Sequence, residues 1–293
     1  PIVIREEQLR VLIVESYPRW EYRYLRNALF RDPGVETSSL LFHPHLDAVG
    51  GGGDDYLAAF PSRPESLAKY DVVFLGDVGV GDNQLTADQC ELLKGLVEHQ
   101  ASGLVFLPGR EGRQQSLLET PLADLYPVVL DPSQPGGTCT GAAGRFQLTE
   151  AGRHSLLTKL AQTPEENQAL WQSLPGFQWL APLVRARPGS EVLAVHAAQS
   201  NRYGRLPLIV TRPYGAGRIL LMATDAAWRW RMGVEDKYHY RFWGQVVRWM
   251  AYQRNMAEGE TMRLYYAPDQ PRTGRALTLN ANVMLPTGEP LTQ

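Results

Sequence analysis

Acidic and basic side chains gather where the predicted strands of this chain end. Each stands just after an apolar run or close to one, and the set is Glu15, Arg19, Asp77, Arg110, Glu111 and Asp225. Because open parallel sheets bind ligands beyond the carboxyl ends of their strands, these groups could form a polar pocket for a cation or for a carboxylate held by arginine. They could instead pair with one another and cap the sheet edge, as structural ion pairs often do. We favour ion pairing and keep the pocket as the alternative.

Aromatic and arginine residues form a second set with possible function. Its members on predicted loops are Tyr17, Trp228, Arg229, Trp230 and Arg231. Tryptophan, tyrosine and arginine dominate the energetics of protein interfaces, so this set is a candidate partner surface. The tryptophan rings could equally pack against arginine stems within the fold. Trp20 and Tyr24 have helical spacing, and we expect them to pack inward.

Two cysteines and two serines are the candidate nucleophiles. Cys90 lies in a predicted helix and reads as a small core residue, whereas Cys139 lies in a Gly/Pro/Thr stretch. The spacing of the two cysteines matches no metal or redox motif. Ser16 and Ser116 are the hydroxyl alternatives, but neither has a histidine nearby in sequence. We therefore expect no catalytic residue.

Metal and cofactor motifs are also missing from the sequence. His43 and His45 flank Pro44, but no further ligand completes a metal set around them. The glycines at 50–53 lack the lysine and the serine or threonine of a phosphate-binding loop, so we read them as a flexible link. We predict neither a metal nor a cofactor.

The elements that must position these residues alternate between strands and helices. Strands are predicted at 11–14, 35–42, 72–75, 103–107, 146–150, 192–196, 208–212 and 218–223, and helices at 18–31, 86–100, 164–174 and 237–253. This order predicts an α/β fold with a mostly parallel sheet and helices on both faces. Glycines at 215 and 217 predict a tight hairpin turn between two of the strands. Residues 43–70 are expected to be irregular, and residues 113–150 are turn-rich.

Beyond residue 257 the pattern changes to alternating apolar and polar residues. Residues 262–266 and 276–284 read as strands, and 286–290 as a turn. We therefore predict two domains: an α/β domain at 1–257, and the start of a truncated all-β, immunoglobulin-like segment at 258–293. The chain also begins without Met, so we expect it to be part of a longer protein.

Several segments resemble a known family. Residues 207–225 (PLIVTRPYGAGRILLMATD), the WRWR run at 228–231, the Phe242–Trp243 pair and residues 14–25 (VESYPRWEYRYL) are similar to the class I glutamine amidotransferase-like superfamily. Within it, they resemble a group found in large bacterial membrane proteins that carry von Willebrand factor type A domains. The likeness covers roughly four fifths of the chain by element order. It implies a flavodoxin-like sheet.

The resemblance also implies where a catalytic triad would stand. Active members carry a nucleophilic cysteine on a strand-to-helix turn, activated by a histidine and a carboxylate. The matching turn at 107–112 reads LPGREG, and Thr224 and Asp225 occupy the histidine position. Likeness of fold does not carry activity across such gaps. The chain therefore looks like a pseudoenzyme.

Charge and hydropathy limit the partners. The formal net charge is −2, with 29 basic and 31 acidic side chains, which gives no case for a nucleic-acid partner. No apolar run reaches the roughly 18 residues of a membrane span, so we expect no direct membrane insertion by this segment.

We therefore expect a non-catalytic module that binds protein or ligand within a larger, membrane-anchored bacterial protein. Its partners would be other domains of the same chain or proteins of a membrane complex, and the side of the membrane stays open. One alternative is a hydrolase or amidase built around Arg110, Glu111 and Asp225. Another is a carbohydrate-binding accessory domain, because similar folds accompany glycoside-processing enzymes.

Overall fold

The computed structural model describes residues 8–43, 53–81, 83–255, 262–267, 274, 276 and 278–283. The glycines at 50–52 and His45 lie outside these residues, as does most of the segment 258–293. Within the described part of the chain, no helix is long and apolar enough to cross a membrane.

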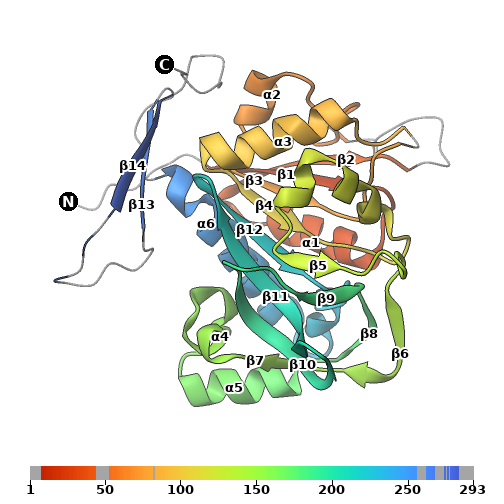
Figure 1. The fold of residues 1–293 in the computed structure, drawn as a ribbon. Helices are drawn as coiled ribbons and strands as arrows, with labels where there is room; N and C mark the ends of the chain where they lie inside the picture. The colour runs from red at the N-terminus through yellow and green to blue at the C-terminus, as the bar shows by residue number, and fades with distance from the viewer. Residues whose placement is uncertain are drawn as a thin grey trace.

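The centre of the molecule is an eight-stranded sheet in the order β2-β1-β3-β4-β12-β11-β10-β7 (Figure 1). In that order the strands are Val35–Leu41, Leu9–Glu15, Val72–Leu75, Gly103–Phe106, Gly217–Met222, Gly204–Tyr214, Glu191–Asn201 and Phe146–Leu148. The strands from β2 to β12 pair in parallel, and β11, β10 and β7 extend the sheet in antiparallel fashion. The predicted α/β fold with a mostly parallel central sheet is confirmed.

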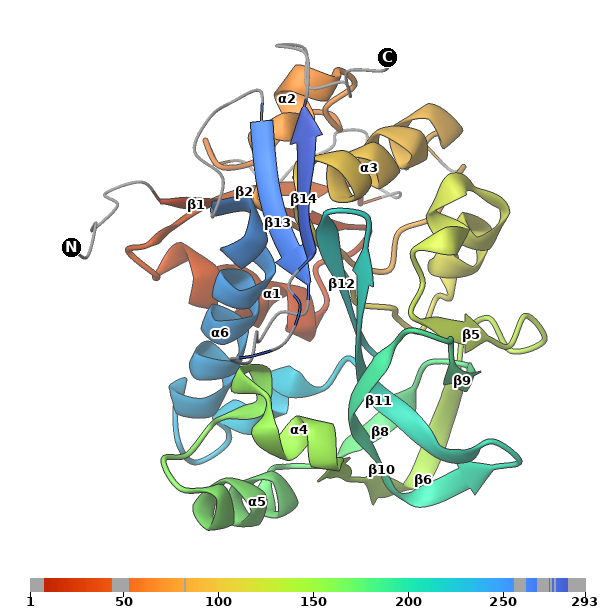
Figure 2. The ribbon, with the colours of Figure 1, turned by 60° about the vertical axis from the view of Figure 1, so that its left-hand side comes forward.

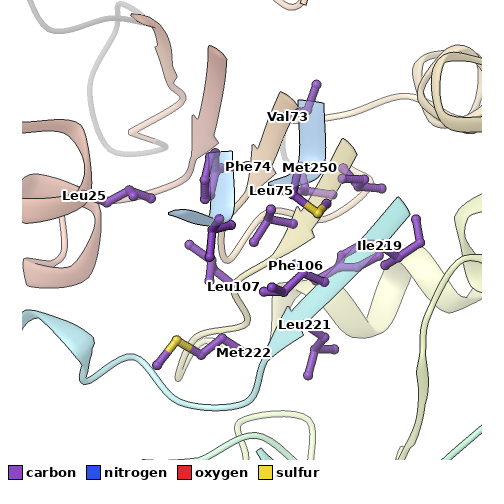
Figure 3. Packing of buried hydrophobic residues seen from close by; sticks show 14 of the residues in the cluster. Leu25, Val73, Phe74, Leu75, Phe106, Leu107, Ile219, Leu221, Met222 and Met250 are labelled. Carbon is purple, nitrogen blue, oxygen red and sulfur yellow. The ribbon is translucent and has the colours of Figure 1, made fainter. Parts of the chain in front are cut away.

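The central strands are buried on both faces, as parallel strands between helices must be. Every residue of β3, β4 and β12 is buried. Figure 3 shows side chains of these strands packing with Leu25 and Met250, which come from helices. Such continuous burial explains why apolar, β-branched runs identified these strands from the sequence.

Helices cover both faces of the sheet. α1 (Trp20–Phe30) and α6 (Lys237–Asn255) pack against each other on one face, and α3 (Ala87–Gln100) covers the other beside α2 (Pro64–Ala68) (Figures 1 and 2). α3 begins with a capping box, in which Thr86 and Gln89 each bond the other's backbone N–H. The predicted bounds of α3 match the observed helix.

The connections reverse direction between β1 and β3. From β1 the chain passes through α1 to β2, whereas from β3 it passes through α3 to β4 on the other side. Ligand sites in open α/β sheets lie at such a switch, outside the carboxyl ends of the strands. Glu15 and Asp77 stand at this place.

Smaller elements lie around the central sheet. They are η1 (Arg113–Glu119), η2 (Pro121–Asp124), β5 (Val128–Leu130), β6 (Thr138–Gly144), α4 (Glu150–His154), η3 (Leu156–Thr158), α5 (Pro164–Ser173), β8 (Phe177–Leu180), β9 (Leu183–Ala186) and η4 (Ala227–Arg231). β5 pairs with β9, and β6 pairs with β8. Most of these elements were not predicted, because they are short and pair with partners far along the chain.

Two further observations concern the segments 43–70 and 258–293. The stretch 43–70, predicted to be irregular, contains α2. Beyond α6, β13 (Met262–Ala267) and β14 (Thr278–Val283) form an antiparallel pair close to the two predicted strands. The boundary near residue 258 falls outside the described residues and stays a prediction.

Candidate functional site

Glu15, at the end of β1, is the most buried of the six charged residues predicted from the sequence. The side chain of Glu15 is 3% exposed. Its Oε1 accepts the backbone N–H groups of Ser16 and Asp77, both at 2.9 Å, and its Oε2 accepts Nε of Arg19 at 2.7 Å. Burial raises the pKa of Glu15, and the charge of Arg19 opposes that rise. Glu15 therefore joins the ends of β1 and β3.

Arg19 joins those strands to the turn after β4. Its Nη1 donates to the carbonyl oxygen of Pro108 at 2.9 Å, and its Nη2 donates to that of Leu107 at 2.5 Å. Burial by itself would lower the pKa of Arg19, but the carboxylates of Glu15, Asp77 and Asp225 outweigh it and raise the pKa. Since both ends of its guanidinium bond the protein, Arg19 acts as an internal tie.

Asp77 shapes the turn after β4. Its Oδ2 accepts the backbone N–H of Glu111 and its Oδ1 that of Arg113, both at 2.9 Å. A Cβ atom on Gly109 would lie 2.6 Å from Oδ2 of Asp77, so only glycine fits where the turn passes over this carboxylate. Asp77 is thus occupied by the loop.

Asp225 and Arg110 are the more accessible pair. Oδ2 of Asp225 lies 3.7 Å from Nε of Arg110, and the two side chains are 19% and 55% exposed. Burial raises the pKa of Asp225, although the charges of Arg19 and Arg110 oppose the rise. Glu111 is exposed.

The structure therefore draws the predicted charged residues together at one edge of the sheet. Glu15, Arg19 and Asp77 are committed to internal bonds, as the ion-pairing interpretation expects. Asp225, Arg110 and Glu111 keep side chains at the surface that could meet a ligand. Among the described residues, no group of three or more His, Cys, Asp or Glu side chains could hold a metal.

Three of the four nucleophile candidates are buried or hydrogen-bonded within the fold, and Cys139 is exposed. Cys90 is buried in α3, and burial raises the pKa of its thiol, which disfavours the reactive thiolate. Cys139 is exposed on β6, opposite Trp179 of β8. Ser16 is buried and donates its hydroxyl to the backbone carbonyl of Asp77 at 2.5 Å. Ser116 donates to the carbonyl of Arg113 at 2.8 Å.

A hollow of about 300 Å³ lies beside the charged residues. It is lined by Gly79, Val80, Gly81, Gln84, Gly112, Arg113, Gln115 and Ser116. None of the six charged residues predicted from the sequence lines it. It opens between the loop after β3 and the start of η1, which follows the turn after β4.

The second predicted set does not form one surface. Trp230, predicted to be exposed, is fully buried, and its ring meets Phe146, Trp171 and Phe242 at centroid distances of 5.6, 5.4 and 5.2 Å. That prediction is wrong, because η4 turns this ring into an aromatic core between β7, α5 and α6. Tyr17 contacts His43 and Arg113, whereas Trp228 contacts other rings.

An exposed aromatic surface does exist around Trp228, with different members. Trp20 and Tyr24 stack at 5.8 Å, and Trp228 lies 5.9 Å from Trp20 and 6.1 Å from Tyr24. Trp20 is 55% exposed, which corrects the expectation that it packs inward. Helix geometry carried the missing signal: at 3.6 residues per turn, Trp20 lies roughly 140° around the axis from Leu25, which is buried.

Glu21 holds Trp228 in this arrangement. The carboxylate is 1% exposed, and its Oε2 accepts the backbone N–H of Trp228 at 3.1 Å. Its Oε1 lies 3.7 Å from Nε2 of His239, a buried residue of α6 that also accepts Nε1–H of Trp243 at 3.1 Å. The start of η4 is therefore fixed against α1.

Solved structures with related geometry include two proteins of Salmonella typhimurium. Cytoplasmic protein STM1381, from strain LT2, matches at a TM-score of 0.55 with 17% identity, over 83% of this chain and 99% of its own. Cytoplasmic protein STM3548 matches at 0.56 with 15% identity, over the same shares. This chain shares their fold. At these identities the likeness says nothing of activity.

Another solved structure matches this chain less well. A ThuA-like protein from Bacteroides uniformis aligns with 89% of this chain and 96% of its own, at 11% identity and a TM-score of 0.45. No family model matches the chain. No curated protein matches it either.

Proposed function

We propose that this chain is a non-catalytic α/β module that acts by binding. The observation that carries the proposal is the turn after β4, where Arg110 and Glu111 stand and where Asp77 binds the loop backbone. An acyl-transfer enzyme needs a thiol or hydroxyl at such a turn, next to a base.

Support also comes from the groups around the turn. Glu15 and Arg19 form hydrogen bonds with each other and with backbone groups at the ends of three strands, so they stabilise the edge of the sheet. Both thiols lie elsewhere, and the hydroxyls of Ser16 and Ser116 donate to backbone carbonyls. A scaffold that binds through its surface fits these residues better than an enzyme does.

We also propose a fold type and a protein family for this chain. The strand order with its switch between β1 and β3 supports a flavodoxin-like arrangement. We place the chain among glutamine amidotransferase-like domains of large, membrane-anchored bacterial proteins, on the sequence resemblance above. Its partners would then be other domains of the same chain or proteins of a membrane complex.

Turnover measurements test the absence of catalysis. We expect neither release of ammonia from L-glutamine nor burst hydrolysis of p-nitrophenyl acetate above the rate with the matched variant Asp225→Asn. A thiol probe should label Cys139 at the rate of an ordinary exposed thiol and leave Cys90 unlabelled while the protein is folded. Turnover that a single substitution at Ser16, Ser116 or Asp225 abolishes would overturn the proposal.

A further inference from the structure

Three rings from two elements form a continuous aromatic surface, which we call the aromatic platform. Trp20 and Tyr24 come from the first turns of α1, and Trp228 comes from η4, more than 200 residues later in the chain. Tyr24 is nearly parallel both to Trp20, at 18°, and to Trp228, at 15°. All three side chains are at least partly exposed.

An arginine lies over each ring of the aromatic platform. The guanidinium carbon of Arg23 lies 5.5 Å from the Trp20 centroid, and that of Arg229 lies 5.2 Å from the Trp228 centroid. The guanidinium of Arg231 lies 3.9 Å from the Tyr24 centroid. Each pair has the geometry of a cation–π contact.

Positive charge exceeds negative charge around these rings. Asp236 pairs with both Arg31 and Arg231. Among the described residues, no carboxylate lies within 4.0 Å of the guanidinium nitrogens of Arg23 or Arg229. A basic spot thus stands on a chain whose net charge is −2. Uncompensated arginines attract acidic groups and discriminate against basic ones.

The platform is held in place before any partner arrives. Glu21 bonds the backbone of Trp228, and the buried Ala227 and Trp230 anchor η4 on both sides of it. Stacking fixes the rings against one another. Because fixed side chains lose little entropy on docking, such a surface suits a specific partner.

We infer that the aromatic platform binds an acidic protein segment that carries an aromatic or aliphatic side chain. Its acidic groups would pair with Arg23 and Arg229, while its apolar side chain would cover the exposed face of Trp20. This inference rests on the proposed binding function and names the partner. Tryptophan and arginine are the residues that most often supply interface energy.

Selection from a random peptide library tests the inference on the full chain. Twelve-residue peptides would be selected on the native protein alone, and the enriched peptides would then be measured on the variant Trp20→Ala, Arg23→Glu, Arg229→Glu. We expect the enriched sequences to combine Asp or Glu with an aromatic or aliphatic residue. Their affinity, measured by fluorescence anisotropy, should fall at least about tenfold in the variant and weaken as salt is added.

A second exposed ring gives a matched control. Tyr203 is 51% exposed, and Arg185 and Arg202 both lie over its ring. The variant Tyr203→Ala, Arg185→Glu, Arg202→Glu changes the same residue classes elsewhere and should keep full affinity. Circular dichroism and thermal unfolding would show that both variants stay folded.

The remaining outcomes overturn the inference. Peptides that bind the platform variant as well as the native chain would move the binding site elsewhere, yet leave the binding function intact. Enriched peptides that are basic, or an empty selection, would contradict the chemistry of the platform. Tighter binding to anionic phospholipid vesicles or to oligosaccharides than to any acidic peptide would assign the platform to another class of partner. Failure of the non-catalytic proposal would appear separately, as turnover.

Discussion

Two carboxylates at the sheet edge differ in how the protein compensates their burial. Glu15 accepts two backbone N–H groups and the guanidinium of Arg19. Asp225 has the charge of Arg19, the looser contact with Arg110 at 3.7 Å and a hydrogen bond from its own backbone N–H. At the residue scale, Asp225 therefore has fewer hydrogen-bond donors and a longer ion-pair distance than Glu15 to compensate its burial.

Asp225→Asn should raise the unfolding temperature near pH 8. Burial raises the pKa of Asp225 in the folded state, so ionised Asp225 lowers stability at pH values above both its folded and its unfolded pKa. The advantage of the variant should shrink as the pH falls through the folded pKa and disappear below about pH 4, where Asp is protonated in both states. Thermal unfolding between pH 3.5 and pH 8 measures this. A constant difference across that range would show that the effect is not electrostatic.

Arg19→Ala should lower the free energy of unfolding by about 3 kcal/mol, because it leaves the Glu15 charge buried without its partner. Adding Glu15→Gln should recover part of that loss, since the unpaired charge is then removed. A double-mutant cycle from urea unfolding measures the coupling. Additive effects of the two substitutions would mean that the pair contributes nothing.

Close approach of β1 and β3 sets what the strand ends can hold. Gly76 follows β3 directly, and a Cβ atom there would overlap the carboxylate of Glu15. At the element scale, the sheet edge thus needs both a small residue on one strand and a long carboxylate on the next. The same edge carries Asp77 and the turn it binds.

Gly76→Ala should destabilise the fold by about 2 kcal/mol, because either Glu15 or the strand end must shift. Gly141→Ala on β6 is the matched control: a Cβ atom there meets nothing within 4 Å, so we expect a change within about 0.5 kcal/mol. Hydrogen exchange should show faster opening of β1 and β3 in the first variant alone. Equal effects of both substitutions would refute the close-approach argument.

The two halves of the sheet are joined by an aromatic core. Trp230 meets Phe146 of β7, Trp171 of α5 and Phe242 of α6. α6 also packs against the parallel strands β1, β3, β4 and β12. At the scale of the whole molecule, the antiparallel extension and the parallel part therefore share one core.

Trp230→Ala should lower the free energy of unfolding by about 3–5 kcal/mol, the cost of emptying a large buried site. Trp20→Ala removes an exposed ring of the same type and should cost no more than about 1 kcal/mol. Denaturant unfolding of the two variants measures the contrast. Similar losses would mean that Trp20 is as important to packing as Trp230.

Local signals allowed much of the fold to be predicted from the sequence. The apolar runs of β1, β3, β4 and β12 are buried on both faces, so composition alone revealed them. Thr86 marked the start of α3, because its capping box is a local structure within four residues. The turn after β4 could be recognised as lacking a thiol or hydroxyl without any coordinates.

Only the tertiary structure decided which side chains meet and which are exposed. Arg19 bonds Leu107 and Pro108, almost 90 residues away, and no local pattern encodes that pairing. Trp228 and Trp230 stand two residues apart, yet the first is partly exposed and the second is fully buried. The exposure of the two rings differs because it depends on the elements packed against each face of η4. Those elements come from distant parts of the chain.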